Sequence, residues 1–82
     1  LMLKEVNPLS PHGGVQKVYE FDNGYGASVI MGPQSYGFSK GLWELAVLKN
    51  GSLCYDTHIT NDVIGRLNEE EVNNYLNLIK EL

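Results

Sequence analysis

The sequence predicts an α+β fold, a four-stranded antiparallel β-meander with one C-terminal α-helix packed on one face. Three observations favour this class. Short runs rich in β-branched and aromatic residues recur between residues 15 and 60, which is typical of strands. Asn-Gly pairs twice separate neighbouring runs, as they do in β-hairpins. An apolar stripe with helical spacing then fills residues 68–82.

The chain of 82 residues is long enough for one small domain, which we place at residues 1–82. Its 43% hydrophobic and 20% charged residues are typical of a soluble globular protein. We expect residues 1–14 to form an irregular N-terminal arm, because Pro8 and Pro11 interrupt regular strand pairing. Leu1 precedes Met2, and we expect Met2 to be the natural first residue.

The meander is predicted over residues 15–60. In its first hairpin, Asn23-Gly24 favours a type I′ turn, because this turn requires a positive φ at both central positions. Asn50-Gly51 repeats the same signal in the second hairpin. The four strands are expected at residues 15–21, 25–31, 42–48 and 53–57.

The run at residues 42–48 is the most apolar, and we expect it to be the central strand. Alternate positions of a strand point to opposite faces of the sheet. Both sets are mainly apolar here: Trp43, Leu45 and Val47 on one side, and Leu42, Ala46 and Leu48 on the other. One helix can cover only one face. We therefore expect the second face to meet either the N-terminal arm or another subunit.

Residues 60–67 are predicted to form a turn or a short helical turn, with Gly65 as a break. A helix is predicted over residues 68–82, where Asn68 can cap the first turn and Glu71 can complete a capping box. The acidic residues 69–71 suit the positive end of the helix dipole. The apolar stripe of this helix consists of Val72, Tyr75, Leu76, Ile79 and Leu82.

The charge and the cysteine content restrict the classes of function. A net charge of −4, with six basic residues that form no run, argues against nucleic-acid binding. The apolar runs are too short for a membrane span, and the first residues lack the pattern of a signal peptide. Cys54 is the single cysteine, so no internal disulfide can form. We therefore expect a cytoplasmic protein that does not contact a membrane.

A glycine-rich loop, MGPQSYGFSKG at residues 31–41, separates two predicted strands. Gly32 and Gly37 have the glycine spacing of a phosphate-binding Walker A loop. Phe38, however, occupies the position of the required lysine, and Lys40 comes two residues late. The segment also leads into a strand, whereas the motif must open a helix. The sequence therefore does not predict a phosphate-binding loop.

Loops of about ten residues in compact domains are often functional. Our candidate binding residues are Gly32, Tyr36, Gly37, Phe38 and Lys40. Tyr36 and Phe38 suit a solvent-exposed linker poorly, so they either pack back onto the sheet or contact a partner. A connection that needs glycine only for its bends is the other interpretation, and the residues alone leave both open.

Cys54, Asp56 and His58 alternate along the predicted strand and would lie on one side of it. Neighbours on one side of a strand are about 6.5 Å apart, beyond the hydrogen-bond contact that a nucleophile and its base require. His12 adds a further potential metal ligand, but the paired spacing of a zinc site is missing. We therefore expect no catalytic set, no metal site and no cofactor, and hence no enzyme.

Four blocks of the chain resemble a family of small proteins encoded by tailed bacteriophages. The blocks are FDNGYGASVIMGPQSYG, GLWELAVL, YDTHITNDVIG and LNEEEV, which lie within about residues 19–76. Phe38 and His58 depart from the family pattern, which has a small residue and a proline at these positions. Family members are single small domains without a recognised catalytic motif, so the resemblance transfers no functional residue.

The resemblance implies a phage context, in which small non-enzymatic proteins often act by binding. Our leading hypothesis is a phage accessory protein that binds and inhibits a bacterial host protein, as an anti-CRISPR-like inhibitor does, in the host cytoplasm. An alternative is an oligomeric sponge for a small nucleotide signal, with Tyr36, Phe38 and Lys40 lining a pocket between chains. A minor structural component of the virion is a third possibility.

Overall fold

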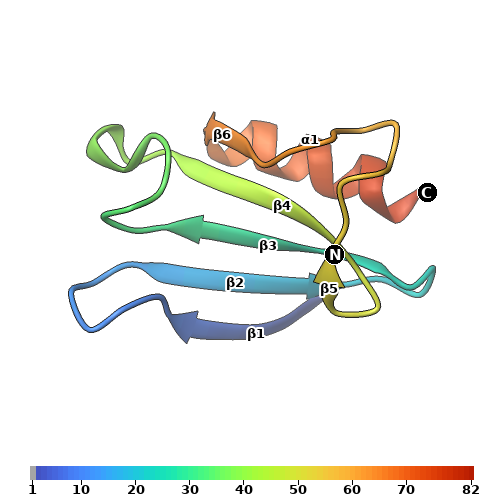
Figure 1. Cartoon of the computed structure of the whole chain (residues 1–82), viewed down its shortest axis with the longest axis horizontal. Coiled ribbons are helices and arrows are strands. Elements are labelled where there is room, and N and C mark those ends of the chain that lie inside the picture. The colour runs from blue at the N-terminus through green and yellow to red at the C-terminus, as the bar shows by residue number, and fades with distance from the viewer. Residues whose placement is uncertain (1) are drawn as a thin grey trace.

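The computed structural model describes residues 2–82, in which six antiparallel strands form one sheet and one α-helix packs on it (Figure 1). The α+β class is confirmed, whereas the predicted number of four strands is wrong. The expectation about the residue before Met2 lies outside the described residues. The elements are β1 (Leu3–Pro8), β2 (Val15–Glu20), β3 (Tyr25–Met31), the 3₁₀ turn η1 (Phe38–Lys40), β4 (Trp43–Lys49), β5 (Ser52–Leu53), β6 (Ile64–Leu67) and α1 (Glu69–Lys80).

The strands β1 to β4 are adjacent in chain order and form a meander. The far edge of β4 is shared by two short strands. β5 pairs with the end of β4, where Leu53 lies opposite Leu48, and β6 pairs with its beginning. β4 therefore has neighbours on both sides, which confirms that the most apolar run is central.

The N-terminal arm is the first correction, because residues 3–8 form a regular strand. β1 pairs with β2 from Leu3, opposite Tyr19, to Pro8, opposite Val15. Proline is tolerated at the end of an edge strand, where its missing N–H breaks no ladder on the solvent side. The arm thus extends the sheet at its edge and does not cover the second face, contrary to one of our two expectations.

The segment after β4 is the second correction. The expected strand at residues 53–57 is reduced to Ser52–Leu53, and residues 54–63 form an irregular connection. The expected turn at residues 60–67 instead ends in β6, with Ile64 opposite Leu45 and Leu67 opposite Trp43. The register shifts between these two pairs, so β6 contains a β-bulge. A strand of four residues with glycine inside carries too little local signal to be recognised.

The two Asn-Gly pairs behave differently. Asn50 has φ 51° and Gly51 has φ 83°, as the predicted type I′ turn requires. In the first hairpin only Gly24 has a positive φ, 85°, so the type I′ prediction is wrong there. The Gly24 N–H donates to the Phe21 carbonyl, and this wider turn directs the Asn23 side chain toward α1.

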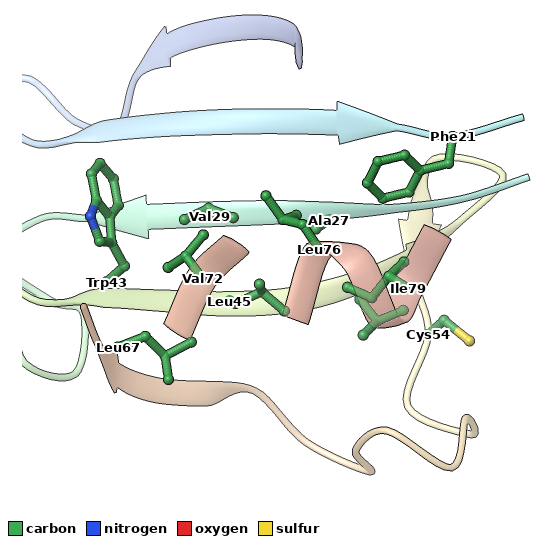
Figure 2. Close-up of a cluster of buried hydrophobic side chains, with 11 residues drawn as sticks. Phe21, Ala27, Val29, Trp43, Leu45, Cys54, Leu67, Val72, Leu76 and Ile79 are labelled. Carbon is green, nitrogen blue, oxygen red and sulfur yellow. The ribbon is translucent and has the colours of Figure 1, made fainter. Parts of the chain in front are cut away.

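The hydrophobic core lies between α1 and one face of the sheet (Figure 2). Its largest fully buried side chains come from β3, β4 and the helix: Val29, Leu45, Val47, Leu76 and Ile79. The odd-numbered side of β4 therefore faces the helix, in keeping with the predicted alternation. Trp43 closes one end of the core, where its Nε1–H donates to the Glu69 carboxylate at 3.3 Å and Lys17 lies 4.8 Å from its ring centroid.

Both ends of α1 are held by asparagine side chains. At the start, Asn68 Oδ1 accepts from the Glu71 N–H at 2.8 Å, and the Glu71 carboxylate accepts from the Asn68 N–H at 3.0 Å. This is the predicted capping box. At the end, Asn23 Nδ2 donates to the carbonyls of Ile79, Lys80 and Leu82 at 2.9, 3.0 and 3.1 Å. The first hairpin turn is thereby fixed to the last turn of the helix.

Asn23→Ala is expected to lower the free energy of unfolding by about 1–2 kcal/mol, because it removes donors from the last carbonyls of the helix. Asn23→Asp is expected to cost more, since a negative charge at the negative end of the helix dipole is unfavourable. Urea unfolding followed by circular dichroism measures both, with the exposed Asn61→Ala as the control. Equal stability of all three variants would contradict the role of Asn23.

Candidate functional site

The loop between β3 and β4 is compact and is shaped by its own hydrogen bonds. The buried Ser35 hydroxyl donates to the Gly32 carbonyl at 2.8 Å and accepts from the Gly32 N–H at 2.9 Å. The 3₁₀ turn η1 then lies between Gly37, with φ 86°, and Gly41, with φ 67°. Glycine is favoured at both positions because other residues rarely adopt a positive φ. These glycines therefore serve the bends of the loop.

Tyr36 lies on the loop against the beginning of β4 and the bulge in β6. Its backbone N–H donates to the Glu44 carboxylate at 3.1 Å. A Cβ added at Gly65 would lie only 2.6 Å from the Tyr36 Cβ, so the tyrosine requires glycine at this position. The Arg66 guanidinium lies 5.3 Å from the Tyr36 ring centroid, within the range of a cation–π interaction. The residue as a whole nevertheless stays 56% exposed.

Arg66 carries the backbone strain of this site. Its φ of 60° lies in the left-handed region, which is uncommon for a residue with a side chain. The bulge in β6 imposes this conformation and turns the Arg66 side chain toward the Tyr36 ring. Strained residues persist where the surroundings determine them, and they cluster at functional positions. The strain therefore marks this corner as a candidate site.

The five predicted loop residues divide into two groups. Gly32 is buried against the Leu9 side chain, and Gly37 lies against Arg66, so both shape the loop rather than face solvent. Phe38 is 41% exposed, and Lys40 is also exposed. The sequence left open whether Tyr36 packs back onto the sheet or is available to a partner. The structure shows both features, because its Cβ packs on β6 at Gly65 while the residue remains exposed.

Sequence reasoning missed Glu44, Gly65 and Arg66 as neighbours of the loop. Gly65 was predicted only as a break in a turn. Tyr36 and Arg66 are far apart in the sequence and meet only because β6 pairs with β4. No local signal in the sequence predicts that contact.

Three hollows lie away from the loop, besides a small one of about 20 Å³ beside Tyr19, Tyr25 and Leu48. One of about 400 Å³ is lined by Met2, Phe21, Asp22, Asn23 and Lys80. A second, of about 500 Å³, lies beside Leu53, Cys54, Tyr55 and Asp56. The third lies on the outer side of α1, between Glu71 and Leu78. None of these three hollows is lined by residues of the candidate loop.

The pair Cys54 and Asp56 corrects another expectation. The Cys54 thiol donates to the Asp56 carboxylate at 2.9 Å, although strand spacing predicts no contact. Residues 54–56 are not in a strand, so the chain can bring these side chains together. This hydrogen bond lowers the pKa of the Asp56 carboxyl below its ordinary 3.8, against a smaller opposing effect of desolvation. His58 is exposed in the segment that follows.

The described residues 2–82 contain no group of three or more side chains placed to hold a metal ion. Within the same residues, α1 is too short to cross a bilayer.

Burial raises the pKa of the Tyr19 phenol, and the nearby Glu69 carboxylate adds to this effect. A neutral tyrosine beside the core is consistent with a structural role.

Comparison with known proteins finds no matching family model, no matching curated protein and no matching solved structure. The resemblance to small phage proteins therefore stays a prediction from the sequence.

Gly65→Ala is expected to lower the free energy of unfolding by about 1–3 kcal/mol, because the new methyl group would overlap Tyr36. Gly65 does not have a positive φ, so alanine adds no backbone strain there. Tyr36→Gly removes the overlapping Cβ, and the double variant is expected to lose less than the sum of the two single variants. Chemical unfolding of the unsubstituted protein, the two single variants and the double variant measures this coupling. Additive losses would contradict the contact.

Cys54→Ala is expected to raise the pKa of Asp56 toward its ordinary 3.8, because the thiol hydrogen bond favours the charged carboxylate. Cys54→Ser keeps a donor and is expected to preserve the low pKa. Since the pKa is lowered by folding, the stabilisation is present above the unfolded pKa and is lost as the pH falls through the folded pKa. An NMR titration of the Asp56 carboxyl carbon measures the pKa. An unchanged pKa in Cys54→Ala would contradict the assignment.

Proposed function

We propose that this protein is a non-enzymatic accessory protein of a tailed bacteriophage, which binds and inhibits a bacterial host protein in the host cytoplasm. The observation that carries the proposal is the loop at residues 32–41, which presents Tyr36 and Phe38 to solvent. Exposed aromatic side chains are frequent energetic anchors of protein interfaces. The phage context comes from the resemblance of the sequence blocks.

The contacts that hold the loop in place support this proposal. The Tyr36 backbone is fixed by Glu44, and its ring is placed by Arg66. Gly37 and Gly41 define the 3₁₀ turn that begins with Phe38. A binding loop that is ordered before it meets its partner loses less conformational entropy on association. A Tyr36 ring held in place beside an exposed Phe38 suits an inhibitor that acts by occupying a surface.

The test begins with capture of host proteins on the immobilised protein, followed by identification by mass spectrometry and a binding measurement with the purified candidate. Tyr36→Ala combined with Phe38→Ala is expected to weaken the affinity by about 100-fold, corresponding to two anchors of roughly 1.4 kcal/mol each. Leu78→Ala, which removes an exposed apolar side chain from α1, is the matched control.

Inhibition is then measured as loss of the activity of the captured host protein with increasing amounts of this protein. Binding that survives the loop substitutions unchanged would place the interface elsewhere. A captured protein whose activity is unaffected would contradict the inhibitory role.

The second candidate is an oligomeric sponge for a small nucleotide signal. It is favoured by the Arg66 guanidinium beside the exposed Tyr36 ring, since a ring can stack on a base and a cation can hold a phosphate. Lys40, on the loop itself, adds a second exposed cation. Calorimetry with cyclic dinucleotides, together with sedimentation to determine the oligomeric state, distinguishes this function from protein inhibition.

A further inference from the structure

We propose that the sheet face opposite α1 is the docking surface for an amphipathic helix with basic flanks, supplied by the host protein. The proposal deepens the proposed function and rests on it, because it defines the chemistry of the partner. We use the name open face for the β1–β4 surface turned away from the helix. In Figure 1, α1 lies behind the sheet and the open face is turned toward the viewer.

The strand register defines which side chains form the open face. Because Leu45 and Val47 point into the core, Ala46 and Leu48 point to the opposite side. Paired residues of antiparallel strands lie on the same face. The apolar members of the open face are therefore Val18, Ile30, Ala46, Leu48 and Leu53.

These side chains form an apolar track that polar side chains interrupt. Ala46 is 8% exposed and lies opposite Ser28, whose hydroxyl accepts a hydrogen bond from Gln16 Nε2 on the same face at 2.9 Å. Leu53 is 61% exposed at one end of the track. At the other end Glu44 contacts Tyr36, which connects the track to the candidate loop. β4 has seven residues and spans about 23 Å, which matches about four turns of helix.

Acidic residues define the charge of the partner. Glu5 lies opposite Val18, Glu20 lies opposite Gly26, and Glu44 lies opposite Ile30, which places all three on the open face. Lys4 offsets part of this charge through an exposed pair with Glu20 at 3.3 Å. The remaining negative charge favours lysine or arginine beside the apolar stripe of a partner helix. It disfavours a second copy of this chain, which would bring like charges together.

The edges of the sheet argue against a partner that binds as an added strand. The outer strand β1 contains a register irregularity between Leu3 and Glu5, carries Lys4 and ends at Pro8. Bulges, lysine and proline are features that protect edge strands from pairing. At the other edge, β5 and β6 have only two and four residues. A partner is therefore expected on the face, where a helix is the usual element that covers a sheet.

A second exposed apolar patch, Met2, Leu3 and Val6, serves as an internal reference. Leu3 and Val6 lie opposite Tyr19 and Lys17, so they belong to the helix side of the sheet. This patch lies on the other side of the sheet from the open face. A substitution there tests whether binding depends on the open face or on exposed apolar residues in general.

The experiment selects binders from a displayed library of random 16-residue peptides against the immobilised full chain. We expect the selected peptides to be amphipathic helices, with apolar residues at i, i+3, i+4 and i+7 and lysine or arginine beside them. Leu53→Asp is expected to weaken their binding about tenfold or more, and Glu5→Lys about threefold. Val6→Asp, the matched control, is expected to leave the affinity unchanged within about twofold. Thermal unfolding verifies that each variant is folded.

Selected peptides that lack a helical pattern or a basic flank, or that bind Leu53→Asp equally well, would overturn the proposal. Sedimentation that reveals a dimer dissociated by Leu53→Asp would also overturn it, because a second copy would then occupy the face. If host-protein capture depends on Tyr36 and Phe38 while no basic helix is selected, this inference fails and the proposed function stands. If basic helices are selected but the captured host protein keeps its activity, the docking surface stands and the inhibitory role fails.

Discussion

The structure depends on the central strand β4, whose two sides are both apolar. Leu45 and Val47 are fully buried against α1, and Trp43 closes the end of the same core. The four-residue strand β6 and the helix that follows it are sufficient to bury this side in a chain of 82 residues. The other side, with Ala46 and Leu48, receives no second layer from the described residues, and the surface proposed for a partner is a direct consequence.

The helix is positioned by contacts at both ends as well as by its buried stripe. Asn68 supplies the capping box within its own turn, whereas Asn23 reaches the last carbonyls from the first hairpin. The loop site depends on the opposite end of the sheet, where the bulge in β6 brings Arg66 to Tyr36. The Asn23 contact with the helix and the Arg66 contact with the loop therefore lie at opposite ends of the sheet.

Features that depend on residues close together in the sequence were predicted better than features that depend on distant residues. The capping box and the Asn50-Gly51 turn were predicted because each depends on residues within a few positions of one another. The contact of Cys54 with Asp56 was missed because strand geometry was assumed where the chain is irregular. For the candidate site, Tyr36 and Phe38 could be singled out from the sequence, but their exposure and the contact of Tyr36 with Arg66 could not be predicted.

The sequence by itself determined the α+β class, the meander from β2 to β4 and the start of the helix, because alternation, turn residues and caps act locally. Only the tertiary structure decided that β1 joins the sheet, that β6 pairs with β4 and that Arg66 adopts a positive φ. It also decided that Asn23 would cap a helix more than fifty residues away. The physical reason is that short edge strands and bulges have little intrinsic preference for their conformation. Their backbone groups find partners only when the rest of the sheet is in place.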